Sequence, residues 1–150
     1  MAKKFTKQGL EKFKKELDFL KNVKQREIAK QLKYAAGFGD FSENAAYDQA
    51  KEARAFVRGR IIELEKILVN AQVIDISSND KAEIGSTITI SSDEGKEIVQ
   101  IVESEEADPL NKKISFQSPL GKALYQKKAG DKAIIETSAG KTTYQILKIA

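Results

Sequence analysis

Residues 9–40 read GLEKFKKELDFLKNVKQREIAKQLKYAAGFGD, and this stretch governs how the first half of the chain folds. Its first apolar residues are spaced three, four and three positions apart: Leu10, Phe13, Leu17 and Leu20. This spacing is typical of the seam of a coiled-coil helix. Thr6 is a suitable N-cap for that helix. Gly37 and Gly39 predict its end near Ala36, because glycine readily adopts C-cap and turn conformations.

A second helical pattern follows Asp40. Its apolar residues recur at steps of three or four: Ala46, Ala50, Ala53, Val57, Ile61, Leu64 and Leu68. Each helix would hold about 27–30 residues and reach about 40–45 Å. The short connection makes the two helices antiparallel neighbours. Residues 1–76 are therefore expected to form an antiparallel coiled-coil hairpin.

The second half, residues 77–150, follows the two-residue period of β-strands. The expected strands are residues 86–91, 97–103 and 113–118, followed by a closing hairpin around Ala139 and Gly140. Ser118 and Pro119 provide an N-cap and a first helical residue for one short helix. A few antiparallel strands with one helix form a compact domain, so the whole chain is predicted to be a two-domain α+β protein.

The composition narrows the possible chemistry. Charged residues make up 32% of the 150 residues and the apolar set 41%, and no apolar run reaches the roughly 18 residues of a membrane span. The basic first residues lack the apolar core of a signal peptide, so we expect a cytoplasmic protein without membrane contact. The absence of Cys and His excludes disulfides, the usual zinc sites and Ser-His-Asp or Cys-His catalysis. The remaining carboxylates favour hard cations such as Mg²⁺.

The charge is distributed unevenly between the two halves. Residues 1–76 carry 16 Lys and Arg against 11 Asp and Glu, a net charge of +5. Residues 77–150 carry 10 against 11, a net charge of −1. A basic first half favours a polyanion or an acidic partner surface, although a solvated lysine-rich helix face explains the charge equally well.

Asp40 and Glu43 lie in the connection between the two predicted helices and have two interpretations. Asp at the N-cap with Glu three residues later resembles a capping box, and both charges suit a helix N-terminus. Alternatively, both carboxylates are exposed at the hairpin tip. Two carboxylates alone hold Mg²⁺ weakly, so the site would be completed in the active site of another molecule, at a two-metal phosphoryl-transfer centre. The two interpretations are compatible.

Several segments occur in an order that resembles the bacterial GreA/GreB transcript-cleavage factors, and GreA more than GreB. They are FTKQGLEKFKKELDFL (5–20), GDFSENAAYDQAK (39–51), GRIIELEKIL (59–68), AQVIDI (71–76), EIGSTITI (83–90), EEADPLNKKISFQSPLGKAL (105–124) and AGD (129–131). The likeness covers nearly the whole chain. Its most specific part is the tip pattern GD-x-x-ENA-x-Y.

The resemblance implies that the hairpin enters the secondary channel of bacterial RNA polymerase. Asp40 and Glu43 would act there as catalytic carboxylates that help to bind the catalytic Mg²⁺, shared with the polymerase, and its attacking water. The polymerase would then cleave the 3′ end of its own backtracked nascent RNA, and the arrested complex would be rescued. The chain is therefore expected to be an accessory factor rather than an enzyme, a monomer that binds no cofactor alone.

The second domain of this family is FKBP-like and docks on the rim of the channel. In this chain the partner-binding role would fall to Ser118, Pro119, Leu120 and Leu124. Two other functions remain open. One is a regulator that blocks the channel without promoting cleavage, and the other is a chaperone or isomerase that uses the FKBP-like half.

Lys51, Arg54 and Arg58 are spaced three and four residues apart and therefore lie on one helical face. They are candidates for contacts with RNA phosphates, and a solvated face is the alternative. The chain departs from the family pattern at Ala46, where glutamate is frequent, and at Arg58, where an acidic residue is usual. Residues 35–39 also lack the basic residue commonly found before the tip.

Overall fold

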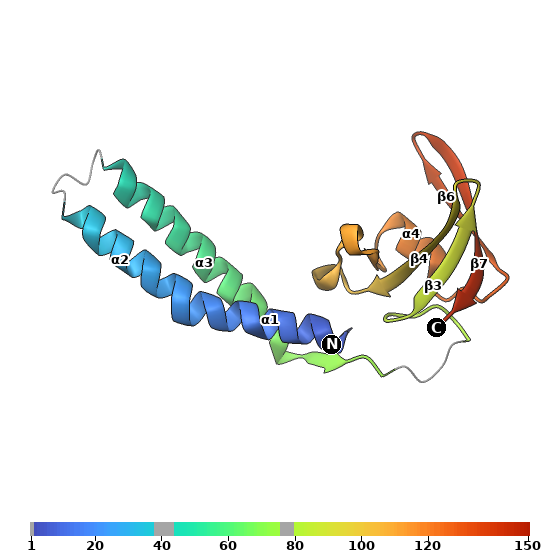
Figure 1. The fold of residues 1–150 in the computed structure, drawn as a ribbon, viewed down its shortest axis with the longest axis horizontal. Helices are drawn as coiled ribbons and strands as arrows, with labels where there is room; N and C mark the ends of the chain where they lie inside the picture. Colours follow the sequence, from blue (N-terminus) through green and yellow to red (C-terminus); the bar gives the residue numbers. More distant parts are fainter. Residues whose placement is uncertain (1, 38–43, 76–79) are drawn as a thin grey trace. The chain divides into compact units, whose positions relative to one another are not determined.

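The computed structural model describes residues 2–37, 44–75 and 80–150 (Figure 1). The chain divides into two compact units. One is the helical hairpin, Leu10–Asn70, and the other is the sheet domain, formed by Met1–Gly9 together with Ala71–Ala150. The change of period predicted a domain boundary between residues 76 and 77. That boundary stays a prediction.

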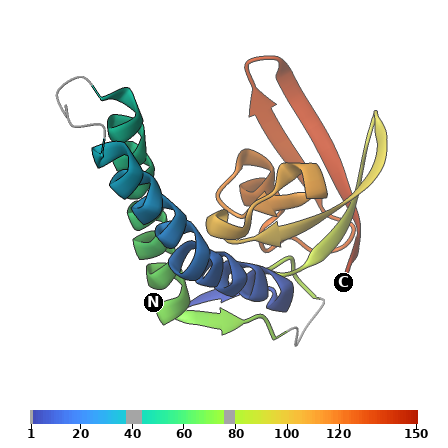
Figure 2. The same ribbon diagram turned by 60° about the vertical axis from the view of Figure 1, so that its left-hand side comes forward.

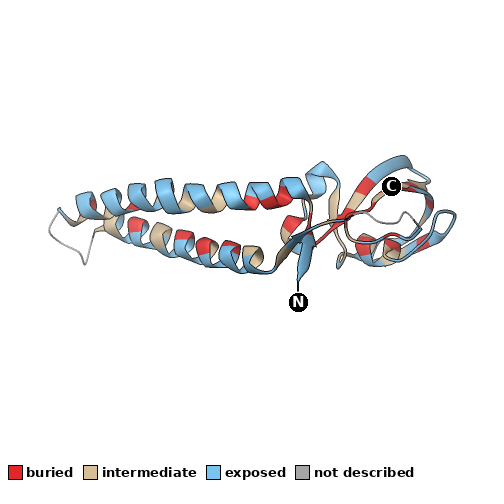
Figure 3. Ribbon diagram, turned by 90° about the horizontal axis from the view of Figure 1, so that it is seen from below, coloured by how far each residue is buried: buried red, intermediate tan, exposed pale blue. Residues whose placement is uncertain are grey.

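The hairpin contains the helices that the spacing of apolar residues predicts. They are α1 (Lys7–Phe19), the π-helical turn η1 (Leu20–Lys24), α2 (Gln25–Ala36) and α3 (Ala45–Val69). Figures 1 and 2 show α2 and α3 side by side, as their contacts require. Their seam consists of Ile28, Val57 and Ile61, with Leu17, Leu20, Leu32 and Ala53 packed around them. Buried positions recur along these helices in Figure 3, which confirms the predicted coiled-coil pattern.

The ends of the first helix also lie where the sequence predicts them. Thr6 caps α1, because its Oγ1 accepts a hydrogen bond of 2.9 Å from the N–H of Gly9. At the other end, α2 stops at Ala36 with Gly37 as its C-cap. Gly37 keeps a right-handed φ of −66°, so this cap does not use the left-handed conformation. The sequence pattern did not predict the π-helical turn η1.

The sheet domain is built on a five-stranded sheet in the order β5-β4-β3-β7-β6. Its strands are β3 (Thr87–Ser92), β4 (Gly95–Val102), β5 (Lys113–Ser115), β6 (Lys132–Thr137) and β7 (Gly140–Ile149). All pairs are antiparallel except β4 with β5, where Gln100 opposes Lys113 in a parallel register. The predicted antiparallel α+β domain is thus confirmed, with one parallel edge strand.

The core of the sheet domain is a cluster of buried residues from the sheet strands and α4. Its fully or almost fully buried aliphatic residues include Ile88, Ile90, Val99, Ile101, Leu124 and Ile146. The short helix α4 (Pro119–Leu124) packs on this core through Leu120 and Leu124. Ser118 caps α4, since its Oγ accepts a 3.0 Å hydrogen bond from the N–H of Gly121. This confirms the predicted start of the helix.

Two short strands and two 3₁₀ turns complete the sheet domain. They are β1 (Lys3–Phe5), β2 (Ala71–Val73), η2 (Ser104–Glu106) and η3 (Pro109–Asn111). β1 and β2 pair in parallel, which joins the beginning of the chain to the segment after α3. The sequence pattern did not predict this pair. Among the described residues, no helix has the length and apolar character needed to cross a membrane.

Candidate functional site

The candidate site is the end of the hairpin where α2 stops and α3 begins. Its two predicted carboxylates, Asp40 and Glu43, fall in residues 38–43, outside the described part of the chain. The structure therefore describes the residues that hold the two helix ends on either side of them. Among the described residues, no group of three or more acidic side chains is placed to hold a metal ion.

Asn44 fastens the two helix ends to each other. Its Oδ1 accepts a 3.1 Å hydrogen bond from the N–H of Tyr47, which caps α3. Its Nδ2 donates a 2.6 Å hydrogen bond to the carbonyl oxygen of Ala35, in the last turn of α2. One half-buried side chain therefore bonds a backbone N–H at one helix end and a backbone carbonyl at the other.

This arrangement corrects the capping-box interpretation. That interpretation placed Asp40 at the N-cap of the second helix and Glu43 at its third position. The N-cap is Asn44, so both carboxylates precede the helix in the sequence. Asn44 therefore supplies the N-cap of α3, and the metal-binding role of Asp40 and Glu43 stays a prediction.

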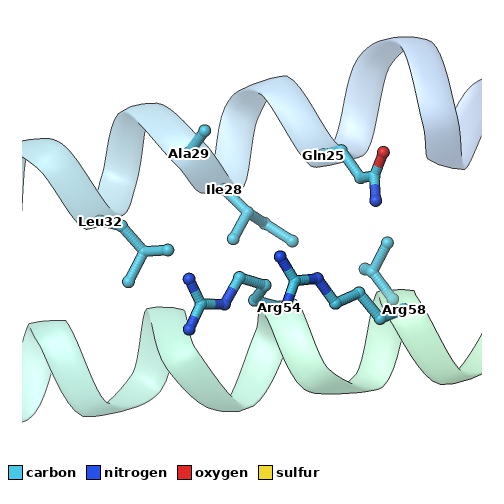
Figure 4. A pocket seen from close by; sticks show the side chains of 7 residues that line it. Gln25, Ile28, Ala29, Leu32, Arg54 and Arg58 are labelled. Carbon is cyan, nitrogen blue, oxygen red and sulfur yellow. The ribbon is translucent and has the colours of Figure 1, made fainter.

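Two of the three predicted basic residues lie together on the flank of the hairpin. Arg54 and Arg58 line a cavity of about 320 Å³ between α2 and α3. Figure 4 shows their side chains extending from α3 into the space between the helices, towards Ile28 and Leu32. The other lining residues are Gln25, Ala29 and Val57. The cavity thus combines an aliphatic wall with two guanidinium groups.

Lys51 lies one helical turn nearer the tip and does not line this cavity. Its ammonium group is 5.6 Å from the centre of the Tyr47 ring, a cation–π distance. The predicted basic face is therefore divided into an arginine pair over the cavity and a lysine against an aromatic ring.

The arginine pair differs from Arg60, further along α3. Arg60 binds Glu16 through two hydrogen bonds of 2.7 and 2.8 Å and lies 3.2 Å from Glu63. The hydrogen bond from Arg60 lowers the pKa of Glu16, and the same contact raises the pKa of Arg60. Within the described residues, no carboxylate forms such an ion pair with Arg54 or Arg58. Arg58 is exposed and Arg54 is half-buried.

The predicted partner-binding residues of the sheet domain have different environments. Pro119 is exposed and Leu120 is half-buried against the core. The Oγ of Ser118 accepts from Gly121 and donates to the carbonyl oxygen of Ser115 over 2.6 Å. Leu124 is completely buried. The prediction is wrong for Leu124, because a core side chain cannot reach a partner.

Two structurally important residues were missed from the sequence. Asn44 was detectable, since Asn is a preferred N-cap and directly precedes the alanines that open α3. Gly121 was not, because its role depends on tertiary packing. A Cβ atom there would overlap the carbonyl oxygen of Ser115 and lie 2.8 Å from Cα of Phe116. Only glycine lets α4 approach the preceding backbone so closely.

Comparison with known proteins matches both parts of the chain. Residues 3–73 match the family described as "Transcription elongation factor, N-terminal", and residues 77–150 match "Transcription elongation factor, GreA/GreB, C-term". The transcription elongation factor GreA of Thermoanaerobacter pseudethanolicus is 47% identical over 148 residues, which cover 96% of this chain and 94% of that protein. The GreA of Clostridium botulinum is 46% identical over 154 residues, covering 99% and 96%.

Among solved structures, GreA factor homolog 1 of Thermus thermophilus aligns with 100% of this chain and 99% of its own. Its TM-score is 0.47 and its sequence identity 28%. The two family matches together span almost all of the sequence, and the GreA relatives are similar over nearly their full lengths. The chain therefore belongs to the GreA/GreB family of transcription elongation factors.

Proposed function

We propose that this chain stimulates the cleavage of backtracked nascent RNA by bacterial RNA polymerase, through a hairpin inserted into the secondary channel. It acts as an accessory factor, and the polymerase provides the nuclease activity. Family membership supports the process. The observation that carries the mechanism is the N-cap at Asn44, because it leaves the cap of α3 independent of Asp40 and Glu43.

Asp40 and Glu43 supply carboxylate oxygens to a Mg²⁺ ion shared with the polymerase. When bound, such an ion would supply Lewis acidity for a water nucleophile and for the developing charge at a phosphodiester. Two carboxylates alone are too few ligands for tight Mg²⁺ binding, so the polymerase provides the others. The contribution of Asn44 is positional, since it joins the last turn of α2 to the first turn of α3 on both sides of the carboxylates.

The arginine pair provides a second point of contact with RNA. A displaced nucleotide has an anionic phosphate and an apolar base face. Arg54 and Arg58 offer guanidinium groups for the phosphate, and the exposed Ala29 and half-buried Leu32 offer apolar surface for the base. Lys51 is exposed and adds a positive charge closer to the tip. In the sheet domain, Pro119 and Leu120 are the accessible residues for docking on the polymerase rim, and Ser118 fixes the helix that presents them.

The double variant Asp40→Asn with Glu43→Gln tests the proposal. It removes both negative charges but changes the side-chain volumes little. We expect RNA cleavage in arrested polymerase complexes to slow by about tenfold or more, since amides are poor Mg²⁺ ligands. The melting temperature should stay within about 2 °C of the wild type, because neither residue caps α3.

The matched control is Asp48→Asn with Glu52→Gln, which removes the same charge from exposed positions of α3. This control should cleave at the wild-type rate. Normal cleavage by the Asp40 and Glu43 variant would show that the metal assignment is wrong. If the wild-type chain slowed RNA extension and released no short RNA, it would instead be a blocker of the channel.

A further inference from the structure

The carboxylate of Glu106, in η2, is buried against the beginning of α1. Glu106 is only 8% exposed. Its Oε1 accepts a 2.9 Å hydrogen bond from the backbone N–H of Thr6, and the hydroxyl of Thr6 donates to its Oε2. The same hydroxyl accepts the N–H of Gly9. The N-cap of α1 is therefore oriented by a carboxylate 100 positions away in the sequence.

Glu106 also supplies a charge that α1 itself lacks. The first turn of α1 begins with Lys7 and contains no acidic residue. A negative charge stabilises a helix N-terminus, because the first N–H groups of a helix carry partial positive charge. Glu106 provides that charge from the sheet domain. Lys113 of β5 lies 3.4 Å from its Oε2 and balances the buried carboxylate.

Gly9 is the residue that makes room for this carboxylate. A Cβ atom at position 9 would lie 2.5 Å from Cδ of Glu106 and 2.7 Å from its Oε2. Because Glu106 is buried, its side chain has little space to move away. Gly59, in the middle of α3, has no atom within 4 Å of the corresponding position. The absence of a side chain at Gly9 therefore leaves room for the Glu106 carboxylate, whereas Gly59 has no such neighbour.

Other contacts hold the same segment in the sheet domain. Phe5 is completely buried, and Lys3 forms a 2.7 Å ion pair with Glu105. These contacts explain why Met1–Gly9 belongs to the same compact unit as Ala71–Ala150. The helix α1 begins inside that segment and continues into the hairpin unit without a break.

We propose that Glu106 is a positioning residue: by holding Thr6, the N-cap of α1, it anchors the root of the first hairpin helix to the sheet domain. This anchor consists of the two hydrogen bonds between Thr6 and the carboxylate and of the close approach of that carboxylate to Gly9. Its consequence for RNA cleavage rests on the proposed function. When the root is loose, the tip spends less time in the productive position, so the maximal cleavage rate falls while docking through the sheet domain is preserved.

Amide hydrogen exchange of the full chain tests the anchor directly. In Glu106→Ala, exchange at the Thr6 amide should accelerate about tenfold or more, because that N–H loses its acceptor. Glu106→Gln keeps an oxygen that can accept from Thr6 and should retain most of the protection. Lys113→Met removes the ion pair and should leave Thr6 protected. Equal Thr6 protection in the wild type and Glu106→Ala would overturn the anchor.

A double-mutant cycle tests the match between Gly9 and Glu106. Gly9→Ala should lower the melting temperature or accelerate Thr6 exchange in the wild-type background, because its methyl group displaces the carboxylate. In the Glu106→Ala background, Gly9→Ala should neither lower the melting temperature nor accelerate Thr6 exchange. There it should behave like the control Gly59→Ala. Identical effects of Gly9→Ala in both backgrounds would contradict the proposed contact.

Cleavage by arrested polymerase complexes tests the positioning role. We expect Glu106→Ala to lower the maximal rate at least threefold, with a half-saturating concentration within twofold of the wild type, and Glu106→Gln to restore the rate. An unchanged maximal rate together with lost Thr6 protection would refute positioning. If the wild-type chain failed to stimulate cleavage, the proposed function would be wrong. Amide hydrogen exchange and the double-mutant cycle would still show whether Glu106 anchors α1.

Discussion

Individual charges on the hairpin have different partners, and this difference separates structural from functional residues. Arg60 is neutralised by Glu16 and Glu63, whereas Arg54 and Arg58 face a cavity with an aliphatic wall. The residue spacing places Arg54 and Arg58 on one helical face but does not show which arginines are paired with carboxylates. Glu16 on α1 and Glu63 on α3 itself distinguish Arg60 from the other two.

The ion pair between Glu16 and Arg60 predicts a pH-dependent stability. The folded chain holds the pKa of Glu16 below its ordinary value of 4.5, so the pair stabilises the fold above that pH. The contribution is lost as the pH falls through the lowered pKa. Since the side chains are 37% and 28% exposed, solvent screening limits it to about 0.5–1 kcal/mol.

Urea unfolding of Glu16→Gln, Arg60→Gln and the double variant measures this coupling. We expect a coupling energy at pH 7 that largely disappears at pH 3. The pair of Lys21 and Glu65 is the control. Both of its side chains are 47% exposed, so its coupling should be smaller at pH 7. An equal Glu16–Arg60 coupling at the two pH values would contradict the assignment.

At the scale of elements, close backbone approach sets the position of α4. This helix has only six residues and one capping side chain, so its stability comes from packing on the core. Its glycine lies against the connection that follows β5. Both this backbone contact and the local sequence therefore determine where α4 forms.

Gly121→Ala should destabilise the sheet domain by about 1–3 kcal/mol, because its methyl group would force backbone atoms of Ser115 and Phe116 to move. Thermal or urea unfolding of the full chain measures this change. Gly59→Ala, at an open helical position, should instead stabilise the chain by about 0.5–1 kcal/mol. Equal effects of the two substitutions would show that α4 tolerates a side chain at position 121.

At the scale of the whole molecule, positive charge is concentrated in residues 1–76, with a net +5 against −1 in residues 77–150. Such an asymmetry favours binding of a polyanion by the hairpin half. We propose the arginine pair, Arg54 and Arg58, as the specific location of this attraction. Its contribution should be visible in the salt dependence of RNA binding.

The variant Arg54→Gln with Arg58→Gln should weaken binding of a short single-stranded RNA. The slope of log affinity against log salt concentration should fall by about 1.4, since each lost phosphate contact removes about 0.7. Fluorescence anisotropy at several salt concentrations measures both quantities. Arg60→Gln is the control, because its charge is already paired with carboxylates. A slope unchanged from the wild type would exclude the arginine pair as a phosphate site.

Local pattern was sufficient for most of the elements and for part of the candidate site. The spacing from Leu10 onwards identified the hairpin, and Thr6 and Ser118 were correctly placed as caps. The spacing also grouped Arg54 and Arg58, which line one cavity, while their contact with RNA stays a prediction. These features succeed because they depend on residues within one or two helical turns of each other.

Contacts between distant residues were beyond the sequence pattern. The pairing of β1 with β2, the parallel register of β5 on β4 and the burial of Leu124 all depend on segments brought together by folding. The cap at Asn44 was assigned to the wrong residue, because Asp40 with Glu43 satisfied the same local rule. A local rule cannot choose between two acceptable caps when a bond to the facing helix decides between them.

The amino-acid sequence alone determined that this chain has a helical hairpin, a small α+β domain and two carboxylates between the helices. Periodicity and capping are short-range properties, and they need no knowledge of the folded neighbours. Tertiary structure decided which distant side chains meet. Asn44 bonds both helix ends of the hairpin, Arg54 and Arg58 share a cavity, and Glu106 accepts from the N-cap residue of α1, since burial and long-range contacts exist only after folding.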